Sequence, residues 1–253
     1  MNSTRVKEWW SGLSRRTLIS VVLILVLLLS SGIGVLADYF WDLLWGEGLI
    51  PSPTGIVVVD DGSVDGTMKV LEEMKEQKSG SDIFKVHFSM LNSGKGFAIR
   101  IGLRYATGEI VIIQDADLEY DPADYPKILE PILKGEADVV YGSRFMGKSR
   151  PEGMAFMNWM ANRLLAIMAT ILYGKHITDE ATCYKAFRRD VIDTVELTCQ
   201  RFEFCPEVTS KVLKKKYRLV EVPISYQGRT TLEGKKITWW DGIVAIWTLL
   251  KYR

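Results

Sequence analysis

Four acidic residues stand within nine positions in the segment Q-D-A-D-L-E-Y-D-P, from Gln114 to Pro122. The segment directly follows I-V-I-I (110–113), an apolar run that is typical of a buried strand. Carboxylates that crowd at a strand end must be solvated, protonated or matched by a cation. Asp115 and Asp117 lie two positions apart, so an extended backbone places both side chains on one face. Such a pair can chelate Mg²⁺ or Mn²⁺ and leave positions open for substrate phosphates.

Glu119 continues the same spacing and can supply a third ligand. We therefore predict a metal site formed by Asp115, Asp117 and Glu119. The alternative is an acidic turn, in which Asp121 and Pro122 only begin the next helix. A short D-x-D motif is common in proteins, but its position directly after a strand favours the metal site.

Two other polar segments have residue types suited to a nucleotide. Asp60 and Asp61 follow the apolar run 56–59, and a carboxylate there can accept a hydrogen bond from a base N–H or a ribose hydroxyl. N-S-G-K-G (92–96) opens a helical pattern, which places backbone N–H groups and the Lys95 cation where a phosphate would bind. The segment lacks the spacing of a P-loop. A glycine-rich helix entry is the alternative interpretation.

Alternating strand and helix patterns position these residues. Apolar strand patterns cover 56–59, 84–90, 110–113 and 138–141, and helical patterns cover 65–77, 97–106 and 125–133. This alternation predicts an α/β fold with a mostly parallel sheet flanked by helices. Ligands of such sheets bind beyond the carboxyl ends of the strands. Four strand ends are polar here, the last being Gly142–Arg144, so we expect a single site.

The composition narrows the class of protein. A net charge of +1 gives no support for binding to nucleic acid. Two histidines are too few for a zinc site, and three cysteines without a C-x-x-C pair argue against a disulfide framework. Any metal is therefore expected to be a hard ion held by oxygen.

The segment from Thr17 to Ala37 carries no charge and is long enough to cross a bilayer as a helix. Basic residues precede it, which predicts a cytoplasmic N-terminus. We expect a membrane helix here. Two alternatives stay open, namely a signal peptide cleaved after V-L-A (35–37) and a buried first strand, because I-S-V-V (19–22) is rich in β-branched residues.

The second half of the chain is less regular. Apolar helical patterns cover 154–173, which includes Arg163, and 206–216, and a strand pattern covers 219–226. The last segment, 237–251, combines tryptophans with basic flanks and predicts a helix lying in a membrane interface. The alternative is a C-terminal helix docked on the core.

Motifs from residue 56 to the C-terminus occur in the order of a known family. The chain resembles the family 2 inverting glycosyltransferases of the GT-A (Rossmann-like) fold, and among them the dolichyl- or polyprenyl-phosphate sugar transferases, such as dolichol-phosphate mannose synthases. Besides Q-D-A-D-L-E-Y-D-P, the motifs are V-V-V-D-D-G-S-V-D-G-T (57–67), N-S-G-K-G-F-A (92–98), Y-G-S-R-F (141–145), I-T-D-E-A-T-C-Y-K-A-F-R-R (177–189), R-F-E-F-C-P-E (201–207), E-V-P-I-S-Y (221–226) and E-G-K-K-I (233–237).

The resemblance implies a role for each group of residues. Asp60 and Asp61, with Lys95 and Asp115, would contact the nucleotide, and Mg²⁺ or Mn²⁺ on Asp115, Asp117 and Glu119 would hold the donor diphosphate. Arg144 and Arg163 would bind the lipid phosphate of the acceptor, because guanidinium favours bidentate contacts with phosphate. Further candidates for the acceptor phosphate are Lys185, Arg229 and Lys235.

The acceptor decides which catalytic groups are needed. A lipid phosphate is already an anion and needs no strong base, and Asp117 and Arg144 are then the catalytic candidates. A hydroxyl acceptor needs a carboxylate base, and Asp179 resembles that position in relatives; capping or ordering of the acceptor loop is its alternative role. We expect a lipid-phosphate acceptor, a membrane location and a catalytic domain at the cytoplasmic face. A hydroxyl acceptor, a catalytically impaired relative and a non-enzymatic nucleotide-binding module are the alternatives.

One family feature is missing. Relatives begin with a strand of the form S-V-V-I-P-x-Y-N-E, which lies centrally in the sheet, and this chain has no P-x-Y-N-E segment. Either the apolar run 18–29 serves as a degenerate strand, or the strand at 56–59 lacks its neighbour.

We divide the chain into an N-terminal segment (1–54), a glycosyltransferase domain (55–230) and a C-terminal interfacial helix (231–253).

Overall fold

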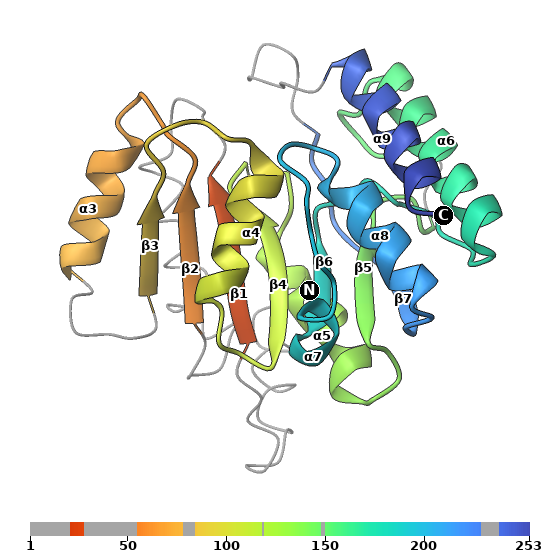
Figure 1. Cartoon of the computed structure of the whole chain (residues 1–253), viewed down its shortest axis with the longest axis horizontal. Helices are drawn as coiled ribbons and strands as arrows, with labels where there is room; N and C mark the ends of the chain where they lie inside the picture. Colours follow the sequence, from red (N-terminus) through yellow and green to blue (C-terminus); the bar gives the residue numbers. More distant parts are fainter. Residues whose placement is uncertain (1–20, 28–54, 78–83, 118, 148–149, 229–237) are drawn as a thin grey trace.

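The computed structural model describes residues 21–27, 55–77, 84–117, 119–147, 150–228 and 238–253. Its centre is a seven-stranded sheet in the order β3-β2-β1-β4-β6-β5-β7 (Figure 1). The strands are β1 (Val21–Leu27), β2 (Gly55–Asp60), β3 (Phe84–Phe88), β4 (Ile110–Asp115), β5 (Val139–Ser143), β6 (Lys185–Arg188) and β7 (Leu219–Pro223).

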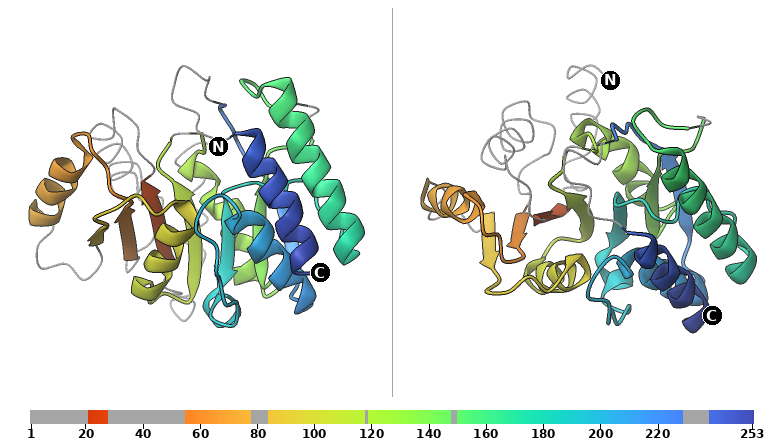
Figure 2. Two further views of the ribbon diagram at one scale, coloured as in Figure 1. Left: turned by 45° about the horizontal axis from the view of Figure 1, so that its top comes forward. Right: turned by 90° about the horizontal axis from the view of Figure 1, so that it is seen from above.

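Helices cover both faces of this sheet. Helices α4 and α8 lie on one face and α5 lies on the other (Figure 2). The helices are α3 (Thr67–Gln77), α4 (Lys95–Tyr105), α5 (Tyr125–Leu133), α6 (Phe156–Tyr173), α7 (Arg189–Ile192), α8 (Phe204–Lys214) and α9 (Trp239–Lys251). The predicted α/β architecture is confirmed, and the strands and helices predicted between residues 56 and 141 lie within a few residues of their observed positions.

Strand β6 was not predicted, and it makes the sheet mixed. It runs antiparallel to both β4 and β5, while the other pairings among the described strands are parallel. Its four residues are too few to show a period-two pattern. The strand nevertheless matters for the site, because it follows directly on the segment that contains Asp179.

Strand β1 corrects the interpretation of the N-terminal apolar run. Residues Val21–Leu27 lie between β2 and β4 and run parallel to both, with Val26 opposite Val59 and Asp115. The predicted membrane helix is therefore wrong for these seven residues, which instead form the first strand of the sheet, the alternative left open above. Without them, the facing edges of β2 and β4 would leave backbone N–H and C=O groups unpaired. The remainder of Thr17–Ala37 lies outside the described residues.

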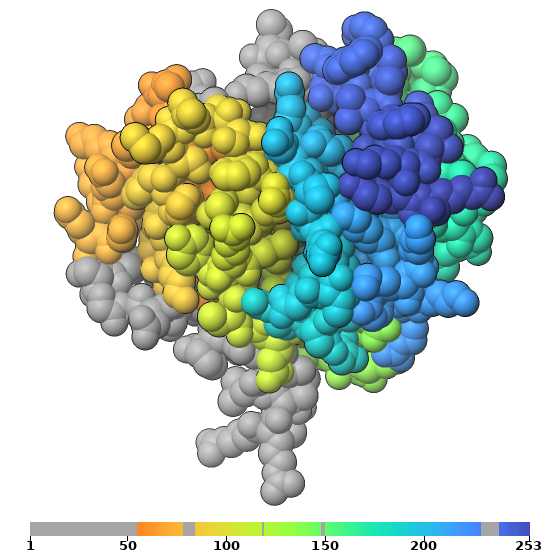
Figure 3. All heavy atoms as spheres, in the orientation of Figure 1, coloured from red at the N-terminus to blue at the C-terminus, as the bar shows by residue number. Residues whose placement is uncertain are grey.

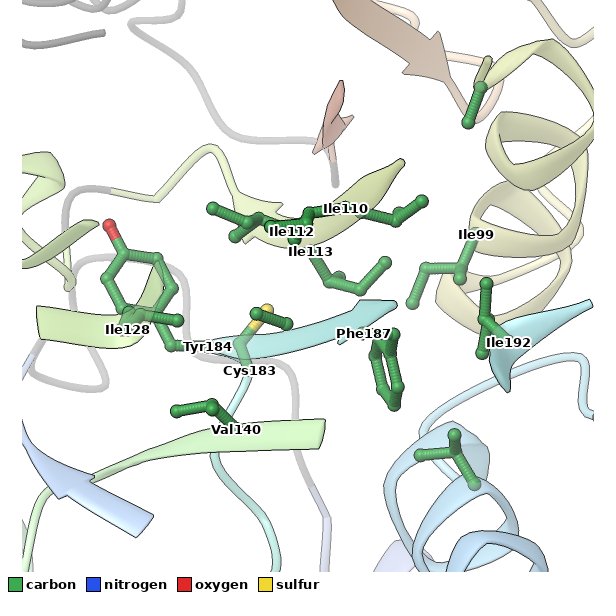
Figure 4. Packing of buried hydrophobic residues seen from close by; sticks show 14 of the residues in the cluster. Ile99, Ile110, Ile112, Ile113, Ile128, Val140, Cys183, Tyr184, Phe187 and Ile192 are labelled. Atoms are coloured by element: carbon green, nitrogen blue, oxygen red, sulfur yellow. The ribbon is translucent and has the colours of Figure 1, made fainter. Parts of the chain in front are cut away.

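The hydrophobic core lies between the sheet and the helices. Val111, Ile112 and Ile113 of β4 have no exposed surface, so this strand is buried on both faces and reads as a continuous apolar run. Figure 4 shows residues of both halves of the chain, among them Cys183 and Phe187, in the same cluster. The second half thus completes the core that the first half begins, which fixes the loops of both halves relative to each other.

Helix α9 docks on the body of the protein. It packs against α6 and α8 through Ala245 and Leu249, and Leu165 and Ala169 of α6 lie in the same cluster. Figure 3 shows α9 and α6 at one side of the molecular surface. Within the described parts of the chain, no helix has both the length and the apolar character needed to cross a membrane.

Candidate active site

The two aspartates at the end of β2 hold loops. Asp61 accepts hydrogen bonds from the backbone N–H groups of Ser93 (2.9 Å) and Gly94 (2.6 Å). Asp60 accepts from the backbone N–H of Ser63 (3.2 Å) and from its hydroxyl. Both aspartates are fully buried. Burial raises the pKa of Asp61, although the two backbone N–H groups oppose this rise. The nucleotide contact of this pair stays a prediction, and the loop-holding role is a finding.

The N-terminus of α4 does not bind a phosphate through the backbone N–H groups in the way that the sequence predicted. The N–H of Gly96, in the segment 92–96 that we expected to face a phosphate, donates to the carbonyl of Arg201 (3.0 Å), and the next N–H, that of Phe97, donates to the carbonyl of Gln200 (2.9 Å). Gly94 has a φ of +96°, and a Cβ there would stand 2.6 Å from the carbonyl oxygen of Gln200. These two N–H groups are therefore occupied by the chain itself, and the predicted phosphate cradle is wrong for them.

Lys95 instead serves the metal motif. Its Nζ lies 2.5 Å from Oδ2 of Asp115, and both side chains are buried. Burial opposes the charged form of Lys95, but the Asp115 carboxylate prevails and raises the pKa of the lysine well above its ordinary value. The other oxygen of Asp115, Oδ1, is buried and has no hydrogen bond of good geometry among the described residues, although the thiol of Cys183 lies near this carboxylate. A buried oxygen without such a bond is costly, which favours a metal or a donor group of a ligand at this atom.

A glutamate from the second half of the chain fixes this arrangement. Glu207 accepts from the backbone N–H groups of Thr198 (2.8 Å) and Cys199 (2.7 Å) and forms an ion pair with Lys211. The segment it holds continues to the two carbonyls that bind the start of α4. The motif R-F-E-F-C-P-E (201–207) thus supports the loop that carries Lys95, a function that the sequence alone did not reveal.

The predicted metal ligands lie at one end of the sheet. Asp117 accepts from the backbone N–H of Glu119 (3.1 Å), and Glu119 accepts from the hydroxyl of Tyr226 (3.1 Å). Among the described residues, no three acidic, histidine or cysteine side chains form a preassembled metal cluster. Mg²⁺ and Mn²⁺ do not need one, because they bind through one or two carboxylates together with waters and substrate phosphates. The oxygen donors at Asp115, Asp117 and Glu119 fit such an ion.

Arg144 and Asp179 form a buried ion pair. The Nε and Nη2 atoms of Arg144 donate to the two carboxylate oxygens of Asp179 at 2.7 and 2.8 Å, and the backbone N–H of Arg144 donates at 2.9 Å. Glu221 holds the loop in place by accepting from the backbone N–H groups of Thr178 (2.7 Å) and Asp179 (2.9 Å). Two residues that we predicted separately, for the acceptor phosphate and for base catalysis, are therefore partners.

The other predicted phosphate-binding residues have different positions. Arg163 and Arg144 both lie over the ring of Phe145, with their guanidinium carbons 5.8 and 5.5 Å from its centroid. The predicted role of Lys185 at the acceptor phosphate is wrong in this structure. The side chain is buried and donates to the carbonyls of Glu180 (2.7 Å) and Thr182 (2.8 Å). It cannot reach an acceptor phosphate in this structure. The last two predicted residues, Arg229 and Lys235, lie outside the described residues.

Comparison with known proteins decides the family. The sequence model described as "Glycosyl transferase family 2" matches residues 49–196, which is more than half of the chain. The chain belongs to glycosyl transferase family 2. The matched range includes β2, the Asp115–Asp117 motif and the Arg144–Asp179 pair. Glu207, Glu221 and Tyr226, which hold parts of the site, follow the matched range.

Curated relatives of this family 2 chain act on lipid phosphates by name. The chain is 30% identical over 209 residues to the dolichol-phosphate mannosyltransferase of Pyrococcus furiosus, an alignment that covers 78% of this chain and 55% of the relative. It is 28% identical over 183 residues to the UDP-N-acetylglucosamine–dolichyl-phosphate N-acetylglucosaminyltransferase of Methanococcus voltae, covering 67% and 73%. The chain spans about half the length of the first of these relatives.

Solved structures show that this family 2 chain has an α/β fold of the GT-A type. Glucosyl-3-phosphoglycerate synthase from Mycobacterium tuberculosis, crystallised with Mn²⁺, UDP and phosphoglyceric acid, aligns with a TM-score of 0.67 at 18% identity, covering 99% of this chain and 82% of that chain. Mannosyltransferase PcManGT from Pyrobaculum calidifontis, in complex with GDP-Man and Mn²⁺, aligns with a TM-score of 0.53 at 18% identity, covering 87% and 61%.

The family 2 domain also contains a buried glutamate beside the ion pair. Glu180 is fully buried, and neither of its carboxylate oxygens has a hydrogen-bond partner of good geometry among the described residues. Burial raises the pKa of Glu180 from 4.5 to about 7, although Lys185 opposes this rise. The folded protein therefore keeps a proton on Glu180 at a pH where the unfolded chain has released it.

This proton makes the stability depend on pH. Because the pKa of Glu180 is raised from 4.5 to about 7 in the folded state, its bound proton contributes to the free energy of unfolding. This contribution is complete below pH 4.5 and is lost as the pH rises through 7. We expect Glu180→Gln, which cannot ionise, to gain about 3 kcal/mol relative to the native chain between pH 4.5 and 8. Urea unfolding of both proteins at the two pH values measures this difference. A constant difference across the range would contradict the assignment.

Proposed function

We propose that the chain transfers a hexose from a UDP- or GDP-sugar to the phosphate of a polyprenyl or dolichyl lipid, with Mg²⁺ or Mn²⁺ bound to the donor diphosphate. The observation that carries this proposal is the contact of one side chain with both halves of the site. Tyr226 donates to Glu119 of the predicted metal site, and its ring faces the guanidinium of Arg144. A donor site and a cation for the acceptor phosphate are therefore neighbours.

The charges of the site support a phosphate acceptor. A metal ion on Asp115, Asp117 and Glu119 would neutralise the charge that develops on the departing nucleotide diphosphate. The attacking lipid phosphate is an anion, which Arg144 and Arg163 can bind and orient. A hydroxyl acceptor would instead need a free base, and the proposed base Asp179 is buried and bonded through both oxygens to Arg144.

The names of the relatives agree with this substrate class. One relative is a dolichol-phosphate mannosyltransferase and another transfers N-acetylglucosamine to dolichyl phosphate. The main reason to suspect an impaired enzyme was the missing first strand, and β1 fills that position. We therefore prefer an active transferase to a truncated, inactive relative or to a non-enzymatic nucleotide-binding module.

A lipid acceptor requires contact with a membrane, and two neighbouring helices offer a surface for it. On α6, the exposed side chains include Met157, Leu164 and Ile171, and no exposed residue of this helix is charged. On α9, Trp240 and Trp247 are 58% and 64% exposed. An apolar helix face with tryptophans is typical of a helix in a membrane interface. We call the exposed apolar residues of α6 and α9 the apolar face and propose that it contacts lipid.

Serine at both tryptophans of the apolar face tests this contact. Because Trp240 and Trp247 are exposed, we expect the double variant Trp240→Ser/Trp247→Ser to fold normally but to bind vesicles of phosphatidylcholine and phosphatidylglycerol at least about tenfold more weakly. Cosedimentation with vesicles measures the binding. The control is Val64→Ser/Met68→Ser, which removes exposed apolar residues near α3, at the opposite end of the sheet. Equal loss in both double variants would refute the assignment of the face.

A transfer assay tests the proposed activity. The intact chain is incubated with Mn²⁺ and labelled UDP- or GDP-sugars, either with a polyprenyl phosphate in vesicles or with soluble hydroxyl acceptors. We expect label in the lipid fraction. Transfer to a soluble hydroxyl acceptor but never to the lipid phosphate would contradict the proposal and would favour the alternative with Asp179 as base.

A further inference from the structure

Backbone hydrogen bonds hold the chain on both sides of Tyr226, which follows β7. The N–H of Ser225 donates to Asp124 (Oδ2, 2.5 Å), and the N–H of Gln227 donates to the backbone carbonyl of Glu119 (3.0 Å). The N–H of Ile224 donates to the carbonyl of Ser143 (3.1 Å). The backbone on both sides of Tyr226 is thus attached to the segments that carry the metal motif and Arg144.

The side chain of Tyr226 makes one contact with each half of the site. Its hydroxyl donates to Oε2 of Glu119 at 3.1 Å, and its ring centroid lies 5.2 Å from the guanidinium carbon of Arg144. The ring of Tyr120 packs against it edge to face, with the centroids 5.7 Å apart. A tyrosine has only two side-chain torsions, so a ring fixed in this way can hold a carboxylate and a guanidinium in a constant relation.

In this contact the tyrosine hydroxyl is the donor and the carboxylate oxygen of Glu119 is the acceptor. A donated hydrogen bond to a carboxylate fixes the orientation of that carboxylate, and the orientation of a ligating carboxylate affects how tightly it would hold a metal ion.

We propose that Tyr226 is a positioning residue that couples the two substrates: its hydroxyl orients Glu119 toward the metal, and its ring orients Arg144 toward the acceptor phosphate. This inference rests on the proposed function. It predicts that the two contributions can be separated, because phenylalanine keeps the ring and loses only the hydroxyl, whereas leucine loses both.

Two variants at this position test the proposal, with Mn²⁺ binding as a readout independent of turnover. In the presence of UDP or GDP, electron paramagnetic resonance should show Mn²⁺ bound about tenfold more weakly by Tyr226→Phe, the loss expected for one hydrogen bond to a charged group. The KM for polyprenyl phosphate should change less than about twofold in this variant. In Tyr226→Leu the Mn²⁺ affinity should fall similarly, and the KM for polyprenyl phosphate should rise about fivefold or more through loss of the cation–π contact.

The matched control is Tyr217→Phe, which removes a tyrosine hydroxyl that contacts Thr194 far from the site. This control variant should alter neither the Mn²⁺ affinity nor the KM for polyprenyl phosphate. The proposal is overturned if Tyr226→Phe leaves Mn²⁺ affinity unchanged, if both variants raise the KM for polyprenyl phosphate equally, or if the native chain with nucleotide binds no Mn²⁺. If the Tyr226 variants bind Mn²⁺ more weakly as expected but the native chain transfers no sugar to lipid, the proposed function is contradicted. The inference that the Tyr226 hydroxyl orients Glu119 toward the metal would then still be supported.

Discussion

Replacing Asp117 by alanine is expected to lower sugar transfer at least about 10³-fold, because a metal ion supplies several kcal/mol of stabilisation to the charge on the leaving diphosphate. Asp117 is only half-buried, so the free energy of unfolding should change by less than about 1 kcal/mol. The two measurements are the initial rate of transfer at saturating donor and the urea unfolding midpoint. A large loss of rate with a small loss of stability is the combination that identifies a metal ligand.

The same acidic segment provides the control for this variant. Asp121 carries the same charge four positions further on, but its side chain accepts from the backbone N–H of Ala123 at 2.9 Å and caps the following turn. We expect Asp121→Ala to cost about 1 kcal/mol of stability and to leave the rate within about twofold. Equal turnover by the native chain and Asp117→Ala would refute the metal assignment.

Replacing Asp179 by asparagine is expected to lower the free energy of unfolding by about 3–5 kcal/mol, because it leaves the guanidinium of Arg144 buried without a counter-charge. The pair is bidentate and largely shielded from water, with Arg144 only 7% exposed. Since domains of this size are stable by about 5–15 kcal/mol, such a loss would be evident in urea or thermal unfolding.

Two further variants distinguish stability from function at this pair. Asp193→Asn breaks the exposed ion pair with Arg189 and should cost less than about 1 kcal/mol. The double variant Arg144→Met/Asp179→Leu removes both charges and should recover much of the lost stability. If Arg144 binds the acceptor phosphate, this double variant stays inactive although it is folded. A stable and fully active double variant would show that the pair has a structural function only.

The sequence predicted the part of the site that lies on regular strands. The run 110–113 followed by Asp115 and Asp117 could be interpreted from local patterns, because strand burial and the period of two are properties of neighbouring residues. The grouping of polar strand ends followed from the geometry of parallel sheets. The contacts made by these side chains could not be predicted in the same way, since they depend on residues far away in the chain.

Three cases show this limit. Lys95 was expected at a phosphate and instead pairs with Asp115. The N–H groups at the start of α4 were expected to be free and instead bind carbonyls about a hundred residues later, held there by Glu207. Lys185 was a candidate for the acceptor phosphate and instead is buried, where it donates to two backbone carbonyls. In each case a buried donor found a partner within the protein, as the cost of unsatisfied polar groups requires.

The N-terminal run shows a different kind of limit. A short, continuously apolar segment fits a membrane helix and a fully buried central strand equally well, because neither structure imposes a polar face. The family's P-x-Y-N-E segment, which would have identified the strand, is absent here. The decision for Val21–Leu27 comes from pairing, since β2 and β4 both require a parallel neighbour.

We claim that this sheet, with β1 in place, forms a metal-dependent site for a nucleotide-sugar. Isothermal titration calorimetry of the intact chain with UDP-N-acetylglucosamine and with GDP-mannose, each in Mn²⁺ and in EDTA, tests it most directly. We predict saturable heat with at least one donor in Mn²⁺, none in EDTA, and none from Asp117→Ala in either condition. A folded native chain that gives no heat with either donor, or equal heat in Mn²⁺ and EDTA, would contradict the claim.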